Sequence, residues 1–124
     1  MQQVECQLHA QLRHLLPTVK KAFGALGKSS PKMVKAYMAL GEAAEENNVF
    51  HAKTRELISI AVAITTRCDG CIGVHADAAI KAGATREEVA ATLATAISLN
   101  AGAAYIYSLR ALEAYDTLKP APQS

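Results

Sequence analysis

Apolar residues recur every three or four positions along most of the chain, the spacing that gathers them on one face of an α-helix. In the first such segment, about residues 4–24, these positions are Leu8, Leu12, Leu15, Leu16, Val19 and Phe23. Because proline lacks the N–H that a helix interior uses, we expect Pro17 to kink or divide this segment. A second helix is expected from Pro31 to about Asn47, with Ser30 as its N-cap.

The middle of the chain predicts a helical hairpin. Residues 54–66 contain the run LISIAVAIT, which is apolar nearly all round and is therefore typical of a helix buried at the centre of a domain. We expect Thr54 to cap this helix. The sequence TRCDG then breaks it, and Asp69 is expected to cap a further helix that ends at Gly83.

Two more helices are expected in the last third of the chain. Thr85 and Glu88 have the spacing of a capping box, which predicts a helix start. The residues from Asn100 to Gly102 are interpreted as a junction before a last helix over 101–118. The sequence therefore predicts a single all-α domain, residues 1–124, of about six helices with a central helical hairpin.

Composition adds an expectation about assembly. Apolar residues make up 51% of the chain, yet aromatic residues make up only 5% and tryptophan is absent. Small side chains bury little area each, so a core built from them is weak. We therefore expect further apolar surface to be buried between the subunits of a homo-oligomer.

Charge and hydropathy argue against several classes of protein. A net charge of +2 is small and evenly spread for a nucleic-acid-binding protein. The one basic bias is interpreted as a solvated face, and consists of Lys20, Lys21, Lys28, Lys32 and Lys35. Because we find neither a run of ~18 apolar residues nor a signal-peptide pattern, we expect a cytoplasmic protein with no membrane partner.

Residues 65–77, TTRCDGCIGVHAD, contain the candidate chemistry. Cys68 falls at the break and Cys71 in the first turn of the next helix, where unpaired N–H groups and the helix dipole favour a thiolate. His75 lies four residues after Cys71, on the same helix face, and histidine readily exchanges protons near neutral pH. Four interpretations are open: a redox dithiol, a zinc site, a cysteine nucleophile with a histidine base, or two buried small residues beside a surface histidine.

Glu56 is the candidate acidic partner of His75. In an antiparallel hairpin centred on residue 68, Glu56 lies level with about Ile80, so His75 is displaced by about five residues, roughly 7–8 Å. Two extended side chains or one bridging water can cover that gap. These four residues also offer zinc ligands, but structural zinc sites usually combine two separated ligand pairs, whereas Cys68, Cys71 and His75 crowd into one short segment.

Four further residues are weaker candidates. Cys6 stands alone, and is most simply a partly buried small residue. His51 precedes the hairpin and could approach the site from the loop. Tyr105 and Tyr107 are interpreted as packing or interface residues rather than site groups.

The spacing E-x11-C-x-x-C-x3-H formed by Glu56, Cys68, Cys71 and His75, with its flanking text over about 55–93, resembles the AhpD-like alkylhydroperoxidases of the carboxymuconolactone decarboxylase superfamily. The resemblance implies an all-helical fold that assembles as trimers or hexamers. It also implies a thiol-dependent alkylhydroperoxidase or disulfide reductase, without a cofactor or metal. In that activity Cys68 and Cys71 are the redox pair, and Glu56 and His75 relay protons.

The resemblance also implies partners. Electrons would come from a dithiol donor, such as a dihydrolipoyl or thioredoxin-like protein, and pass to a peroxide or to the disulfide of a peroxiredoxin. The chain departs from the pattern at Gly70, where some members carry a histidine whose role cannot be carried over. Two other functions stay open: a carboxymuconolactone-decarboxylase-like lyase that uses His75 and Glu56 as acid and base, and a redox-sensing oligomer without turnover.

Overall fold

The computed structural model of the chain describes residues 2–47 and 49–120, and within them the side chains of residues 10, 11 and 13 onward. The described residues form five helices and no strand. The helices are α1 (Gln2–Ser29), α2 (Pro31–Glu45), α3 (Ala52–Thr65), α4 (Asp69–Lys81) and α5 (Arg86–Leu118). The prediction of an all-α fold is confirmed.

The predicted number of about six helices is wrong, because α5 continues through the expected junction at Asn100. The Asn100 amide donates to the Ala96 carbonyl at 2.8 Å and to the Thr65 hydroxyl of α3 at 3.1 Å. Its side chain therefore joins α5 to α3, and Asn100 does not interrupt α5. Pro17 likewise lies inside an undivided α1. There the Thr18 hydroxyl donates to the His14 carbonyl at 2.8 Å, beside the hydrogen bond that proline removes.

Two of the predicted helix caps are wrong. Helix α3 begins two residues before Thr54, and His51 is its N-cap, since the Arg55 N–H donates to the His51 carbonyl at 3.1 Å. The N-cap of α4 is Cys68 rather than Asp69, which becomes the first residue of the helix.

Two other local predictions are confirmed. Thr85 and Glu88 form a capping box at the start of α5, with the Thr85 side chain and the Glu88 carboxylate each accepting a backbone N–H. Gly83 follows the end of α4 with φ 84°, a conformation that glycine adopts without the strain of a side chain.

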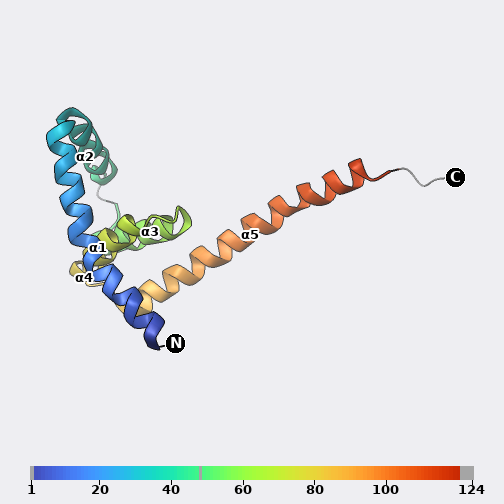
Figure 1. Cartoon of the computed structure of the whole chain (residues 1–124), viewed down its shortest axis with the longest axis horizontal. Helices are drawn as coiled ribbons and strands as arrows, with labels where there is room; N and C mark the ends of the chain where they lie inside the picture. Colours follow the sequence, from blue (N-terminus) through green and yellow to red (C-terminus); the bar gives the residue numbers. More distant parts are fainter. Residues whose placement is uncertain (1, 48, 121–124) are drawn as a thin grey trace.

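The helices pack in a chain of neighbours. Helix α2 lies along α1, α1 packs on α4, α4 pairs with α3, and α3 packs on the first part of α5. Figure 1 shows that the rest of α5 projects away from the other helices and touches none of them. We call residues 104–118 the distal half of α5.

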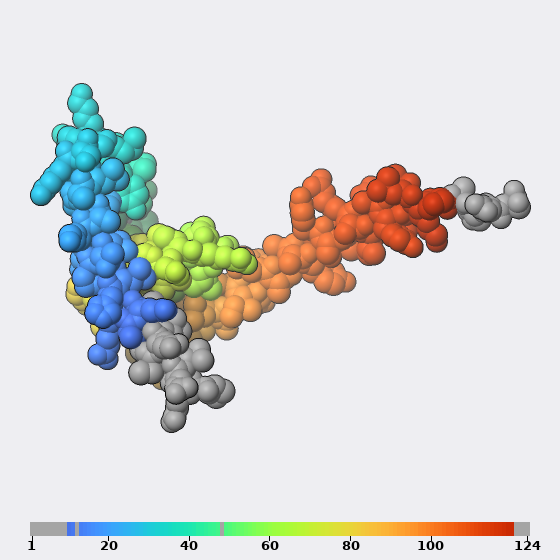
Figure 2. All heavy atoms as spheres, viewed as in Figure 1, coloured from blue at the N-terminus to red at the C-terminus, as the bar shows by residue number. Residues whose placement is uncertain are grey.

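The chain covers little of its own apolar surface. Its accessible surface is 10604 Å², whereas a compact monomer of 13.1 kDa exposes roughly 6400 Å². The buried residues are Ile60, Ala63, Ala79 and Ala96, on α3, α4 and the first part of α5. The space-filling view shows the cause, which is a thin, branched molecule with the distal half of α5 surrounded by solvent (Figure 2).

Helix α5 is the one helix among the described residues that is long and apolar enough to cross a membrane, by length and composition alone. Its most apolar 18-residue window has a mean hydropathy of 1.4, and 6% of that window is buried. No membrane-spanning segment was expected because no continuous apolar run reaches the length of a membrane helix. Helix α5 has this mean hydropathy although polar residues interrupt its apolar ones. The same helix begins with a capping box and an ion pair between Glu88 and Lys53 of α3, so its start belongs to the folded domain.

Candidate functional site

The turn between α3 and α4 places the two cysteines. Arg67 adopts φ 54°, a left-handed conformation that is costly for a residue with a side chain. The next residue, Cys68, donates its N–H to the Ala63 carbonyl at 3.0 Å. This tight turn reverses the chain directly before Cys68, so that α4 starts with the cysteine at its N-cap.

Cys68 and Cys71 form a disulfide across the first turn of α4, with their Cα atoms 5.2 Å apart. The backbone N–H of Cys71 donates to Cys68 Sγ at 3.2 Å. In the reduced protein the same N–H and the positive end of the helix dipole stabilise a thiolate at Cys68. The pair can therefore gain and lose its disulfide with little movement of the backbone.

Glu56 and His75 make a direct contact. Glu56 Oε2 lies 2.7 Å from His75 Nδ1, with no bridging water needed, although the expected axial offset left that open. The two side chains are 19% and 35% exposed, so the pair is partly shielded while the imidazole still reaches solvent. With Nδ1–H donating to the carboxylate, Nε2 is left to accept or release a proton.

Two cavities meet at Cys71 and His75. The larger one, of about 440 Å³, we call the site cavity, and Cys68, Cys71 and His75 line it. Its other lining residues are Val19, Lys20, Phe23, Tyr37, Met38, Gly70 and Val74. A smaller cavity of about 250 Å³ reaches Cys71 and His75 from the side of α3. Cys71 is thus open to a reactant from two directions.

Gly70 lies against α1. A side chain added at its Cα would place a Cβ 3.3 Å from Val19 Cγ2, a distance tighter than ordinary van der Waals contact. Because α1 lies so close to the dithiol, a histidine at this position requires Val19 to move. The departure from the family pattern at Gly70 therefore coincides with the packing of α1 on α4.

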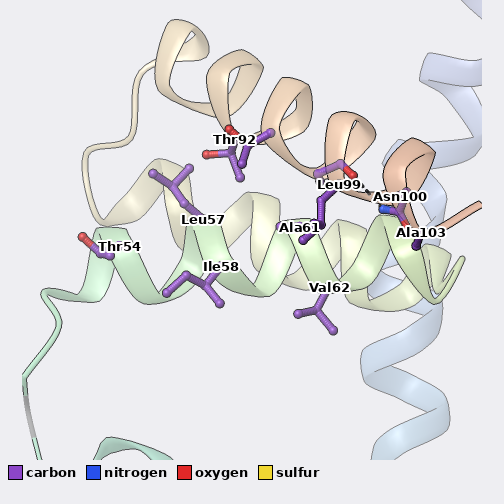
Figure 3. A pocket seen from close by; sticks show the side chains of 11 residues that line it. Thr54, Leu57, Ile58, Ala61, Val62, Thr92, Leu99, Asn100 and Ala103 are labelled. Atoms are coloured by element: carbon purple, nitrogen blue, oxygen red, sulfur yellow. Dashed lines mark hydrogen bonds between the residues drawn. The ribbon is translucent and has the colours of Figure 1, made fainter. Parts of the chain in front are cut away.

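A larger groove of about 660 Å³ runs between α3 and α5. In Figure 3, Leu57 points toward α5, whereas Ile58 and Val62 point to the other side of α3. Ile58 and Val62 also line the smaller cavity at His75, so the two hollows adjoin along α3. The groove contains none of the predicted site residues.

The weaker candidates lie apart from the dithiol. His51 is exposed at the start of α3 and is absent from the lining of both cavities. Tyr105 and Tyr107 are exposed on the distal half of α5. The side chain of Cys6 lies outside the described residues. Among the side chains that the structure does describe, no three of the His, Cys, Asp and Glu residues gather as metal ligands would.

Sequence reasoning missed the part of the site cavity that α1 and α2 line. Lys20 and Phe23 come from α1, and Tyr37 and Met38 from α2, all of them 30 or more residues before Cys68. The Phe23 and Tyr37 rings pack with their centroids 5.8 Å apart and join the two helices. The apolar periodicity of these helices predicts that each has a buried face. It does not predict that this face lies beside Cys68 and Cys71.

The fold agrees with comparisons to known proteins. The sequence model of the carboxymuconolactone decarboxylase family matches residues 31–114, from the start of α2 into the distal half of α5. A carboxymuconolactone decarboxylase family protein from Legionella pneumophila, solved in its apo form, is 31% identical with a TM-score of 0.69, over 89% of this chain and 98% of that one. The chain belongs to the carboxymuconolactone decarboxylase family.

Two curated relatives cover nearly the same region. An uncharacterized protein of Haemophilus influenzae is 69% identical over 101 residues, 82% of this chain and 89% of that protein. A protein of Paracoccus denitrificans described as uncharacterized protein 4 in cox locus is 30% identical over 103 residues, 83% of this chain and 93% of that protein. Neither relative carries an activity over to this chain.

Proposed function

We propose that the protein is a thiol-dependent alkylhydroperoxidase or disulfide reductase that uses Cys68 and Cys71 as its redox dithiol. The observation that carries the proposal is the disulfide at the start of α4, beside the close pair of Glu56 and His75, whose Oε2 and Nδ1 atoms are 2.7 Å apart. A helix start favours the thiolate, and a histidine held by a carboxylate can move the protons that peroxide reduction requires.

The oxidative half-reaction begins at Cys71, because it borders both cavities together with His75. His75 accepts the thiol proton of Cys71, and the thiolate attacks the terminal oxygen of the hydroperoxide. The O–O bond breaks, the alkoxide takes the proton from His75 and leaves as an alcohol, and Cys71 becomes a sulfenic acid. Cys68 then attacks the Cys71 sulfur, which forms the disulfide, and the departing hydroxide takes the Cys68 proton to become water.

The reductive half-reaction needs a dithiol donor, and we place a dihydrolipoyl or thioredoxin-like protein in this role. One donor thiolate attacks Cys71 Sγ and expels Cys68, whose thiolate is stabilised by the Cys71 N–H. The second donor thiol attacks the donor sulfur of the mixed disulfide and releases Cys71. The donor leaves as a disulfide, having supplied two electrons and two protons. A peroxiredoxin disulfide would replace the peroxide in a disulfide reductase.

We place this chemistry in a cytoplasmic homo-oligomer, a trimer or hexamer. The support is the excess of roughly 4000 Å² of accessible surface per chain over a compact monomer, which is more than the roughly 1000–2500 Å² that one partner contributes to a typical obligate interface. Much of that surface is apolar and lies on α5, whose large exposed side chains include Tyr105, Ile106, Leu109 and Leu112. Burial of these side chains between copies also accounts for a membrane-like hydropathy in a domain whose other helices pack on one another.

Consumption of tert-butyl hydroperoxide, with a dihydrolipoyl protein and its reductase as the electron source, tests the proposal. We expect Cys68→Ser and Cys71→Ser to reduce turnover to background, while Cys6→Ser, the control, keeps the wild-type rate. If both site variants keep the wild-type rate, the dithiol mechanism is wrong.

The same variants separate the two sulfur roles. With one equivalent of peroxide and no donor, Cys68→Ser should accumulate a trappable sulfenic acid at Cys71, whereas Cys71→Ser should form little. An active lyase would instead be indifferent to thiol alkylation. A redox sensor would change its native mass on oxidation without consuming peroxide.

A further inference from the structure

The site cavity is larger and more apolar than a small peroxide requires. Its volume of about 440 Å³ lies in the range of small-molecule sites. The apolar side chains that line it together with the disulfide include Phe23, Tyr37, Met38 and Val74. Hydrogen peroxide gains nothing from such a lining, whereas a long hydrocarbon is removed from water along it.

One cation lines this apolar cavity. Lys20 is its only lysine or arginine, and it lies one turn from Phe23 on α1. Between residues 10 and 29, α1 carries Arg13, Lys20, Lys21 and Lys28 and no carboxylate. This part of α1 therefore contributes only positive charge beside the cavity, which favours an anionic ligand.

Asp77, a carboxylate that feels the charge of Lys20, is already engaged by another lysine. Asp77 accepts a hydrogen bond from Lys81 at 2.6 Å, and this bond, together with the charges of Lys81 and Lys20, holds the pKa of Asp77 below its usual value. Among the described side chains Lys20 makes no ion pair of its own. Its ammonium group is thus available to a ligand in the cavity.

We propose that the site cavity binds an amphipathic hydroperoxide, the hydroperoxide of a long-chain fatty acid, with the chain along Phe23, Tyr37 and Met38 and the carboxylate on Lys20. The reaction at the dithiol rests on the proposed function and is unchanged: the hydroperoxide becomes an alcohol and the dithiol a disulfide. The cavity and its cation add substrate selection, in which apolar burial supplies affinity and the lysine supplies preference for a free acid over an ester.

Linoleic acid hydroperoxide, its methyl ester and tert-butyl hydroperoxide separate these contributions in steady-state kinetics. For the wild type we expect kcat/KM for the acid to exceed that for the ester roughly three- to tenfold, the range of a partly exposed charge-assisted contact. Lys20→Met, which keeps an apolar stem, should remove this difference through KM. Lys21→Met, the matched control, should preserve it. Lys21→Met should not alter the rate with tert-butyl hydroperoxide, which carries no carboxylate.

A second pair of variants tests the apolar wall. Met38→Ala should lower kcat/KM more for both linoleate derivatives than for tert-butyl hydroperoxide, whereas Met33→Ala, on the same helix but outside the cavity lining, should change none of these values. Equal rates for acid and ester in the wild type, or equal behaviour of Lys20→Met and Lys21→Met, would overturn the assignment of Lys20 while leaving dithiol turnover of tert-butyl hydroperoxide intact.

Calorimetric titration of the oxidised protein with linoleate tests the site without turnover. We expect binding that weakens in Lys20→Met and not in Lys21→Met. If that pattern is found in a protein that reduces no hydroperoxide, the binding site stands and the proposed function fails. If neither lysine matters to linoleate binding, the cavity does not select an anion and the inference is wrong.

Discussion

The α3–α4 hairpin and the distal half of α5 are built from similar residues and have opposite environments. The hairpin contains the dithiol, the Glu56–His75 pair and three of the four residues that are buried among the described side chains, Ile60, Ala63 and Ala79. The distal half of α5 carries large apolar side chains of which Ile106 is 66% exposed. Apolar composition alone therefore does not distinguish the part of this chain that folds on itself from the part that awaits a partner.

This contrast separates chemistry from assembly. Every residue that we place in the reaction lies within one hairpin and its turn, while the apolar surface that remains uncovered lies largely elsewhere. Substitutions in the hairpin should change the reaction, and substitutions in the distal half of α5 should change the number of copies that associate. Each prediction below tests one side of this division.

The largest effect is expected at His75. His75→Gln removes the proton carrier beside Cys71, and turnover should fall roughly 10²- to 10⁴-fold, the usual contribution of a general acid–base group. Steady-state peroxide consumption measures the fall, and native mass should not change. His51→Gln, an exposed histidine outside both cavities, is the control. Unchanged turnover in His75→Gln would remove the relay from the mechanism.

The next effect is expected on assembly. The double variant Leu109→Glu, Leu112→Glu places two carboxylates on the distal half of α5, and their burial between copies without partners is costly. Sedimentation equilibrium should give a lower mass than for the wild type, with loss of thermal stability. Glu113→Gln, on the same stretch of helix, should assemble normally. A wild-type mass for the double variant would show that this surface lies outside the interface.

Two isoleucines sharpen the comparison directly. Ile60→Ala opens a cavity in the hairpin, where Ile60 is 4% exposed, and should cost about 2–5 kcal/mol in the free energy of unfolding. Ile106→Ala should lower Tm only at concentrations at which the chain is assembled. Thermal denaturation over a dilution series measures both. A concentration-independent loss at Ile106 would mean that the distal half of α5 packs within its own chain.

The smallest effect is expected at the ion pair that joins α3 to the start of α5. The hydrogen bond from Lys53, 2.8 Å long, and those from Thr85 hold the pKa of Glu88 below its usual value of 4.5. A lowered carboxylate pKa stabilises the fold above pH 4.5, and the contribution disappears as the pH falls through the lowered value. Glu88→Gln should therefore lower Tm slightly at neutral pH and leave it unchanged in acid. If Glu88→Gln lowers Tm equally at neutral and at acid pH, the ion pair is not the cause of the loss.

The features that the sequence predicted well are local. The capping box of Thr85 and Glu88 and the left-handed Gly83 depend on residues a few positions apart, and so does the helix that carries Cys71 and His75. The carboxylate partner of His75 could be predicted because a hairpin centred on residue 68 places Glu56 near His75. The structure was needed only to show that Glu56 contacts His75 directly rather than through a water molecule.

The features that could not be predicted depend on packing between distant segments. Asn100 reads as a helix break by composition, but its amide bonds with Ala96 and with Thr65 of another helix. Cys68 displaces Asp69 as the N-cap because its sulfur faces the Cys71 N–H. The part of the site cavity that α1 and α2 line depends on how these helices pack beside α4. The residues around the two cysteines do not predict that packing.

The central claim, that the hairpin dithiol reduces a hydroperoxide, is tested most directly in a single turnover. Fully reduced wild-type protein is mixed with one equivalent of linoleic acid hydroperoxide, and peptide mass spectrometry and product analysis follow the sulfur and the oxygen. We expect one Cys68–Cys71 disulfide and one molecule of alcohol for each hydroperoxide consumed. Thiols that remain reduced while the hydroperoxide persists would contradict the account.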